Sequence, residues 1–325
     1  MRPLENKRPA KTRGILFVIL LSVALIGAAP IFFGPGLNTP EPIGPFQNQS
    51  FPEELPSTDP YEVAFENITF DSPLNFNAVP NSSSIVIGQR DGKIFWFDNN
   101  PDTSIKNLLL DLSSEVGLVW DGGFLGLAIH PQFGTTGRNF FYVYYTTKDR
   151  DGNDFPDFPG ALGCDIESDW GNYLILERFE VNPANLTFVP GSRLNLIKIR
   201  MYSTAHRGGS MSFGNDGFLY LTTGEQAAAR KSQDIINNLD GGVLRLDVDK
   251  DPSRSHAPIR TMPVSIGFYV DMTGNEYWIP NDNPFLSPAG DNFEEYFSLG
   301  LRSPHRMTKD RETGIFYIGD VGSNI

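Results

Sequence analysis

From residue 61 onward, apolar and polar positions repeat one short pattern. A short apolar run is followed by a turn rich in Gly, Asp or Asn, and then by a second run in which aromatic side chains alternate with other residues. Alternation with a period of two is typical of a half-buried β-strand, and such turn residues are typical of hairpins. The pattern therefore predicts four hairpins, over residues 83–98, 127–147, 211–225 and 307–322.

The predicted hairpins are unevenly spaced. Their second strands centre on Phe95, Tyr142, Tyr220 and Tyr317, so the intervals are 47, 78 and 97 residues. Equal periods are typical of solenoids, whereas uneven intervals fit β-propeller blades that carry loop insertions. The predicted fold is therefore all-β, a partial β-propeller. A propeller closes its ring to bury strand edges, and this chain ends at Ile325 straight after a strand, so we expect a C-terminally truncated sequence.

Composition agrees with this fold and narrows the function. Of the 325 residues, 40% are hydrophobic and 20% are charged, as in ordinary globular proteins. The 32 glycines and 25 prolines favour many turns between short strands over a helical bundle. The net charge of -13 opposes binding to nucleic acid, because such binding depends on clustered Lys and Arg. The single Cys164 cannot form an intrachain disulfide.

The first 34 residues differ from the rest of the chain. Basic residues dominate up to Arg13, and residues 15–33 carry no charge. A helix of this length roughly spans a hydrocarbon layer of ~30 Å. We expect a signal anchor that leaves the domain periplasmic or extracellular, with a cleaved signal peptide as the alternative; Pro30 opposes cleavage. Seven prolines in residues 35–60 then predict a stiff spacer ahead of the domain.

Two acidic stretches resemble metal-binding loops at first sight. Asp149, Asp151 and Asn153 alternate as in a calcium loop, but the glycine and glutamate that such a loop needs are missing, which favours a solvated loop. In RLDVDKD, residues 245–251, the carboxylates alternate in the same way, and we interpret them as the polar face of a half-buried strand. Phosphate-binding loops, His-Glu-x-x-His, paired cysteines and nucleophile elbows are absent from the sequence, which weakens hydrolase and nucleotide-hydrolase functions.

Four histidines are the natural candidates for proton transfer at neutral pH. His130 lies between a strand and a turn, where a histidine most often hydrogen-bonds the backbone, and His256 lies in a loop with no other chemical feature. His206 is followed by Gly208 and Gly209, whose lack of a Cβ would let a flat ligand approach the backbone beside the ring. On these residues alone, a structural and a functional role for His206 both stay open.

Five blocks of sequence carry a wider resemblance. They are GGFLGLAIHPQF (122–133), AHRGGSMSFGNDGFLYLTTGE (205–225), LDGGVLRLDVD (239–249), YWIPNDNPF (277–285) and LGLRSPHRMTKDRETGIFYIGDVGSN (299–324). In this order they resemble the glucose/sorbosone dehydrogenase family, whose members are sugar dehydrogenases that use pyrroloquinoline quinone (PQQ) and are built as six-bladed propellers. The resemblance implies that residues 61–325 form about four of the six blades.

The resemblance also implies roles for individual side chains. His206 stands at the position of the general base that removes the proton from the sugar hydroxyl while hydride passes to the quinone. An imidazole, with an ordinary pKa of ~6.5, suits that task. Arg302 and Ser303 stand at cofactor-contacting positions, with Ser303 in place of the family's usual asparagine. A guanidinium suits the carboxylates of PQQ. Asp121 stands where some members place a glutamine against the quinone.

A metal ion belongs to the same resemblance. Gly322 and Ser323 match the turn whose backbone carbonyls help to hold the calcium ion that binds PQQ, and calcium prefers such oxygen ligands. The implied cofactors are therefore PQQ and calcium, and the implied partners are a sugar substrate and an electron acceptor of a respiratory chain. Two alternatives stay open: a non-catalytic extracellular propeller that binds other proteins, and a calcium-dependent propeller hydrolase of the lactonase type.

Overall fold

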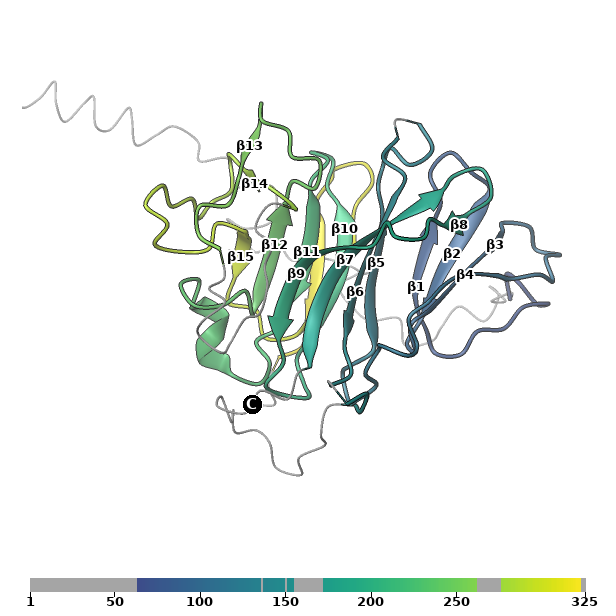
Figure 1. The fold of residues 1–325 in the computed structure, drawn as a ribbon, viewed down its shortest axis with the longest axis horizontal. Helices are drawn as coiled ribbons and strands as arrows, with labels where there is room; N and C mark the ends of the chain where they lie inside the picture. Colours follow the sequence, from purple (N-terminus) through teal and green to yellow (C-terminus); the bar gives the residue numbers. More distant parts are fainter. Residues whose placement is uncertain (1–62, 136, 150, 155–171, 262–275, 323–325) are drawn as a thin grey trace, which may run out of the picture. The chain divides into compact units, whose positions relative to one another are not determined.

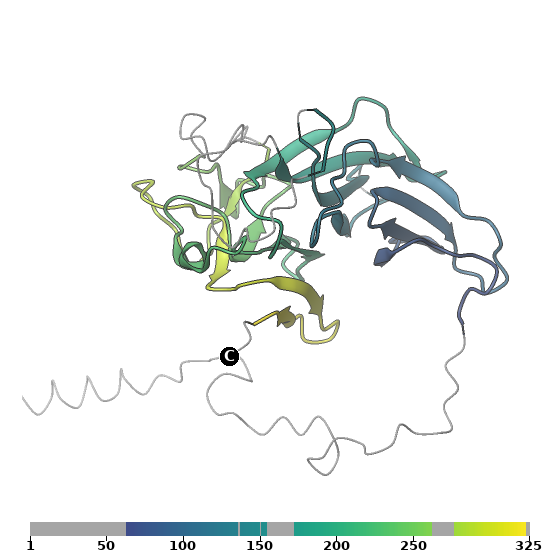
Figure 2. The same ribbon diagram turned by 90° about the horizontal axis from the view of Figure 1, so that it is seen from below.

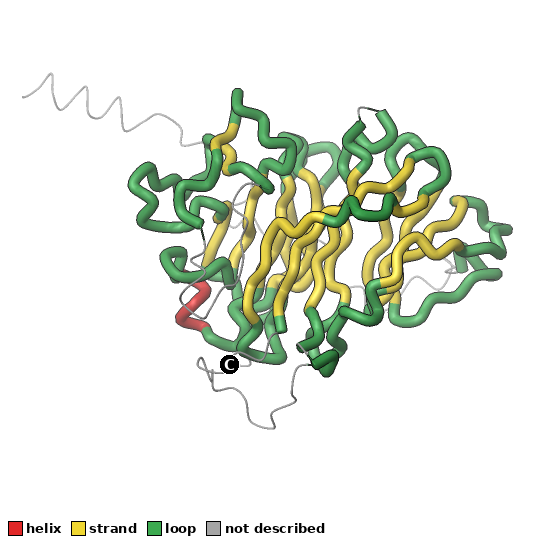
Figure 3. The backbone as a smooth tube through the Cα atoms, viewed as in Figure 1, coloured by secondary structure: helices red, strands yellow, loops and turns green. Residues whose placement is uncertain are grey.

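The computed structural model divides the chain into two units, Met1–Glu62 and Val63–Ile325. Placement is described for residues 63–135, 137–149, 151–154, 172–261 and 276–322. Strands dominate these residues, and the one helical segment among them is a short 3-10 helix, Ala229–Gln233 (Figure 3). The all-β prediction is therefore confirmed.

The predicted anchor (15–33) and spacer (35–60) lie outside the described residues. Within the part of the chain that is described, no helix has the length and apolar character needed to cross a membrane.

Along the described residues, four antiparallel sheets follow one another, besides one small two-stranded ribbon (Figure 1). The first sheet contains β1 (Pro73–Ala78), β2 (Ser84–Gln89), β3 (Lys93–Asp98) and β4 (Asn107–Asp111). The second contains β5 (Phe124–Ile129), β6 (Phe140–Thr146), β7 (Tyr173–Asn182), β8 (Thr187–Phe188) and β9 (Leu194–Arg200). The third contains β10 (Gly208–Phe213), β11 (Leu219–Thr223), β12 (Gly242–Leu246) and β15 (Tyr296–Leu299), and the fourth β16 (Pro304–Lys309) and β17 (Phe316–Asp320). The ribbon pairs β13 (Ser255–His256) with β14 (Ile279–Pro280).

Each of the four sheets contains one predicted hairpin. The hairpins are β2/β3, β5/β6, β10/β11 and β16/β17. In the third sheet, the Gly217 N–H donates to the Gly214 carbonyl, which closes the turn that Asn215-Asp216-Gly217 predicts. Gly217 has a φ of 83°, a conformation that glycine adopts without steric cost.

The first strands of consecutive sheets lie next to one another and point the same way. β5 packs against β1 and β10, and β10 packs against β16 (Figure 2). Near the middle of these strands the Met307 N–H donates to Ser210 Oγ (3.0 Å), and near their ends Lys309 Nζ donates to the Phe213 carbonyl (2.8 Å). The beginnings of β5, β10 and β16 therefore share one end of the sheets, and the residues that precede these strands are brought together there.

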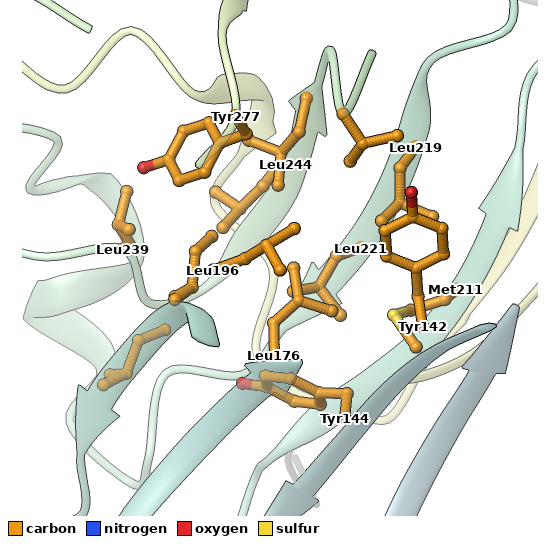
Figure 4. Packing of buried hydrophobic residues seen from close by; sticks show 14 of the residues in the cluster. Tyr142, Tyr144, Leu176, Leu196, Met211, Leu219, Leu221, Leu239, Leu244 and Tyr277 are labelled. Atoms are coloured by element: carbon orange, nitrogen blue, oxygen red, sulfur yellow. The ribbon is translucent and has the colours of Figure 1, made fainter. Parts of the chain in front are cut away.

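Hydrophobic clusters fill the spaces between consecutive sheets. In the largest cluster, Tyr142, Tyr144 and Leu176 of the second sheet pack with Leu221 and Leu244 of the third (Figure 4). Strands β2, β5 and β12 are buried along their whole length. Both faces of a sheet in the middle of such a stack are covered, and each fully buried Leu contributes about 2 kcal/mol to stability.

The stretch 245–251 does not play its predicted role. β12 ends at Leu246, and Asp247 is only 2% exposed. Its carboxylate accepts the N–H groups of Asp249 (2.9 Å) and Asp251 (2.9 Å). The prediction of a strand's polar face was wrong, because this carboxylate folds the turn that follows the strand.

Candidate functional site

His206 forms a close pair with Glu225, a residue that the sequence analysis did not single out. His206 Nδ1 lies 2.5 Å from Glu225 Oε1, and the side chains are 14% and 3% exposed, respectively. A carboxylate accepts a hydrogen bond, which assigns the imidazole proton to Nδ1 and the lone pair to Nε2. Among the described residues, Nε2 has no hydrogen-bond partner. The pair therefore presents a proton acceptor at the shared end of the sheets.

Three backbone contacts fix the position of His206, which has a left-handed φ of 57°. Asp121 Oδ2 accepts its N–H at 2.8 Å, and its carbonyl accepts the Gln226 N–H at 3.2 Å. The same carbonyl lies against Gly224, where an added Cβ would be only 1.9 Å from the oxygen. A glycine is therefore required at 224 for His206 to reach Glu225.

Gly208 and Gly209 serve packing rather than access for a ligand. Both are buried and have positive φ values of 68° and 105°. A Cβ on Gly208 would lie 2.7 Å from the Thr222 carbonyl oxygen, and one on Gly209 would lie 2.5 Å from Leu125 Cβ. The interpretation that these glycines leave room for a flat ligand was wrong, because strands β5 and β11 already fill that space.

Arg302 and Ser303 are brought to the same place as Glu225. The Arg302 carbonyl accepts the Glu225 N–H at 2.9 Å. Asp320 accepts the N–H groups of Arg302 (3.1 Å) and Ser303 (2.7 Å), and Arg302 Nη1 donates to the Val321 carbonyl at 2.9 Å. Within the described residues, the other guanidinium donors of Arg302 have no partner. The site therefore combines a base with a partly engaged cation.

A buried polar network lies behind the base. Arg207 is 1% exposed, and its Nη1 donates to Gln226 Oε1 at 3.0 Å. Gln226 and Tyr202 in turn donate to the carboxylate of Asp240, at 3.0 Å and 2.5 Å. Burial lowers the pKa of Arg207 to about 10 and raises that of Asp240. The network holds Gln226, which in turn holds the His206 carbonyl.

Only part of the predicted calcium turn can be placed. Gly322 follows β17 and is exposed, whereas Ser323 lies outside the described residues. Both oxygens of the nearby Asp320 already accept backbone N–H groups. No group of three or more His, Cys, Asp or Glu side chains that could hold a metal ion occurs in the residues with described placement. The calcium ligands remain a prediction.

The side chains of His130 and His256 both contact neighbouring residues. His130 is 1% exposed, its Nδ1 accepts the Gln132 N–H at 3.1 Å, and its Nε2 lies 3.2 Å from Asp249 Oδ1. The structural role predicted for His130 is confirmed. His256 Nε2 lies 3.3 Å from Glu294 Oε2, and its Nδ1 lies 2.9 Å from Asn281 Oδ1.

Together, consecutive antiparallel sheets define an all-β protein with an imidazole–carboxylate pair at their shared end. The family model described as glucose/sorbosone dehydrogenase matches residues 70–262, and the chain belongs to this family. The resemblance carried by the five sequence blocks is thereby confirmed.

The curated relatives of the chain are not named as dehydrogenases. The chain is 28% identical over 296 residues to the HIPL2 protein of Arabidopsis thaliana, covering 82% of this chain and 40% of that protein. It is 28% identical over 193 residues to the Hedgehog-interacting protein of Homo sapiens, covering 58% of this chain and 22% of that protein. The chain therefore spans less than half the length of these relatives.

Two of the solved structures with a similar fold are aldose sugar dehydrogenases. The PQQ-bound aldose sugar dehydrogenase of Streptomyces coelicolor matches with a TM-score of 0.51 and 21% identity, covering 78% of this chain and 58% of that one. The soluble aldose sugar dehydrogenase of Escherichia coli, in its apo form, matches with a TM-score of 0.54 and 18% identity, covering 80% and 60%. At these identities the likeness establishes the fold alone.

Proposed function

We propose that the protein oxidises an aldose or a related sugar alcohol group in a PQQ-dependent reaction, with His206 as the general base. The observation that carries the proposal is the 2.5 Å contact between His206 Nδ1 and Glu225 Oε1, because it leaves the lone pair of Nε2 for a substrate hydroxyl. Membership of the glucose/sorbosone dehydrogenase family supports the same reaction.

The chain's own residues carry the proton chemistry. His206 Nε2 takes the proton of the hydroxyl that is oxidised, and Glu225 stabilises the imidazolium that forms. Asp121, bound to the His206 N–H at 2.8 Å, keeps the ring in place. Positioned base catalysis of this kind contributes ~10²–10⁴ in rate. When bound, PQQ supplies the acceptor for the hydride that leaves the same carbon.

The donors at the site fit one end of PQQ. The cofactor is a tricarboxylate, and Arg302 retains guanidinium donors that have no partner among the described residues. We propose that Arg302 and Ser303 bind the cofactor, with Asp121 beside it. For calcium, Gly322 and Ser323 would offer backbone carbonyls, which suit a cation that takes about six to eight oxygen ligands.

The wider assembly belongs to the same proposal. The four sheets form part of a six-bladed propeller, an anchor at residues 15–33 holds the domain at the outer face of the cytoplasmic membrane, and electrons leave to a respiratory acceptor. This part rests on the charge-free apolar segment and on the family.

Protein binding is the second candidate function. The 28% identity to a protein named Hedgehog-interacting protein favours it, since a shared fold does not fix function. A lactonase-type hydrolase has less support, because such a site uses several carboxylates around calcium and no such cluster occurs among the described residues.

Reconstitution of the full-length protein tests the dehydrogenase. PQQ and calcium are added, aldoses are supplied, and reduction of an artificial dye is followed together with the absorbance of PQQ. We expect a change in the PQQ spectrum on binding and dye reduction with at least one aldose. Neither signal with any sugar would contradict the proposal and favour the protein-binding function.

A further inference from the structure

A polar cavity lies at the end of the sheets opposite His206. Its volume is about 550 Å³, and three sheets supply its walls: His130 and Arg138 from the second, the β10/β11 turn and the loop after β12 from the third, and Lys309 from the fourth. Cavities of this size accommodate small molecules, and a few polar groups set which molecules they bind. The charges around this cavity therefore decide the class of its ligand.

Two cations that line the cavity hold the turn between β10 and β11. Lys309 Nζ donates to the Phe213 carbonyl at 2.8 Å and to Asn215 Oδ1 at 2.9 Å. Arg254 Nη2 donates to the Asp216 carbonyl at 2.6 Å. All three acceptors are uncharged groups. Within the described residues, neither Lys309 nor Arg254 forms an ion pair with a carboxylate.

The carboxylates that line the cavity already have partners in the protein; they belong to Asp216, Asp247, Asp249 and Asp251. Arg245 Nη2 donates to Asp216 at 2.9 Å, and Arg138 Nε donates to Asp249 at 2.8 Å. The other two each accept a backbone N–H at 2.9 Å. Hydrogen bonds from Ser253, and at longer range the charge of Arg254, lower the pKa of Asp251. The cavity therefore combines engaged carboxylates with two cations that lack an ion-pair partner.

One of these carboxylates keeps an oxygen for a further hydrogen bond. Both charged contacts of Asp249 are made by Oδ1, which lies 3.2 Å from His130 Nε2 and 2.8 Å from Arg138 Nε. A carboxylate oxygen accepts hydrogen bonds and repels a second anion, so a ligand group that reaches Asp249 Oδ2 has to be a donor. The cavity thus offers cationic donors for an oxyanion and an acceptor for a hydroxyl group.

We propose that this cavity binds a small hydroxylated anion. Its phosphate or carboxylate group pairs with Lys309 and Arg254, and its hydroxyl group donates to Asp249. Hydrogen bonds between charged partners are shorter and stronger than those between neutral groups, so the two cations supply most of the affinity. The inference goes beyond the proposed function and does not depend on it, because the cavity and His206 lie at opposite ends of the sheets.

Calorimetric titration of the full-length protein at pH 8 tests the ligand class. The hydroxylated probes are glycerol 3-phosphate and glycerate, and their hydroxyl-free counterparts are methyl phosphate and propanoate. The net charge of -13 disfavours anion binding elsewhere on the protein. We expect at least one hydroxylated probe to bind, its counterpart to bind about tenfold more weakly, and neutral glycerol not to bind. The tighter of the two hydroxylated probes identifies the oxyanion group as phosphate or carboxylate.

Single substitutions then test the two cations. Lys309→Gln and Arg254→Gln should each weaken binding of the tighter probe about tenfold, because each removes a charge-assisted hydrogen bond. The matched control is Lys93→Gln, which removes the same charge from β3, where Lys93 pairs with Asp91. We expect no change there. No binding of either hydroxylated probe by the wild type, or an equal loss in all three variants, overturns the proposal. Equal binding of a probe and its hydroxyl-free counterpart overturns the role of Asp249.

Hydrogen exchange of the wild type locates the ligand even where a variant fails to fold. With the tighter probe present, we expect slower amide exchange in residues 213–218, which form the turn that the two cations hold. Exchange in residues 205–209, next to the candidate base, should stay the same. Protection at 205–209 in place of 213–218, or protection at neither, contradicts a site in this cavity.

Discussion

Two histidine–carboxylate pairs occupy opposite ends of the same sheets and differ in one respect. At the end of β5, His130 Nδ1 accepts the Gln132 N–H, and its Nε2 faces Asp249 Oδ1 at 3.2 Å. Just before β10, His206 is engaged by Glu225 through Nδ1 alone. A carboxylate partner is therefore common to both pairs, and the two histidines differ in whether the second ring nitrogen faces a carboxylate.

A hollow lies at the His130–Asp249 pair. A cavity of about 550 Å³ is lined by His130, Asn215, Asp249 and Lys309, at the end of the sheets opposite His206. Burial raises the pKa of Asp249, but His130 and Arg138 outweigh that effect and lower it overall. Asp249 at this end is paired with both His130 and Arg138.

Replacing each histidine by alanine should separate the two pairs most strongly. We expect His206→Ala to lower kcat by ~10²–10⁴ with PQQ binding retained, because the proton acceptor is lost. His130→Ala should leave kcat unchanged and lower the melting temperature, because it removes the buried contacts that hold the corner after β5. Dye reduction and thermal unfolding measure the two effects. Equal rates for His206→Ala and the wild type would mean that the base is elsewhere.

Replacing the carboxylate of each pair, Glu225 or Asp249, should separate the two pairs in the same direction. The expected loss of kcat is smaller than that for the histidines. Glu225→Gln cannot stabilise an imidazolium, and its amide can donate to Nδ1 and fix the wrong tautomer, so kcat should fall about a hundredfold. Asp249→Asn is the matched control and should leave kcat unchanged. A comparable loss of kcat in both variants would show that the two ends are not functionally distinct.

Glu295 sharpens the comparison, because it is a buried carboxyl with no histidine beside it. Burial raises its pKa from 4.5 to about 7, while the Tyr277 hydroxyl donates to Oε1 at 2.7 Å. The folded state keeps its proton up to about pH 7 and the unfolded state releases it near pH 4.5, so stability falls as pH rises between these values, by about 3 kcal/mol.

Urea unfolding at pH 5 and pH 8 checks this carboxyl. Glu295→Gln keeps an acceptor for Tyr277 but cannot ionise, so its stability should lose about 2.5 kcal/mol less than that of the wild type between the two pH values. The same pH dependence in both proteins would show that Glu295 is ionised without cost.

The smallest effect concerns the residue that holds the base in place. Asp121→Ala removes the acceptor of the His206 N–H and should lower kcat about tenfold, whereas Asp121→Asn keeps an acceptor and should stay near the wild type. Stopped-flow dye reduction measures both. An Asn variant as impaired as the Ala variant would point to a role for the negative charge itself.

The hairpins were predictable because their signals are local, whereas the role proposed for His206 came from the family resemblance. Strands with a period of two flank Asn215-Asp216-Gly217, and the structure contains this hairpin as β10/β11. The same register could have identified Glu225. Gly208 pairs with Thr223, and two residues further out His206 stands opposite Glu225. Counting outward from the turn would have found the pair.

Contacts between sheets could not be predicted in this way. Asp121 reaches His206 from the loop before β5, and the Arg302 carbonyl reaches the Glu225 N–H from the loop before β16. These residues are separated by 85 and 77 positions, and only the packing of first strands brings them together. The types of residue at these four positions do not indicate which strands pack against one another.

Gly224 limits what evolution and engineering can change in this protein. An added Cβ there would meet the His206 carbonyl oxygen at 1.9 Å, whereas at Gly217 the nearest atom would be 3.8 Å away. A library randomised at 217 should return asparagine and aspartate beside glycine, since these residues tolerate a left-handed turn. A library randomised at 224 should return glycine alone, so new specificities are best sought on the loops and not at the end of β11.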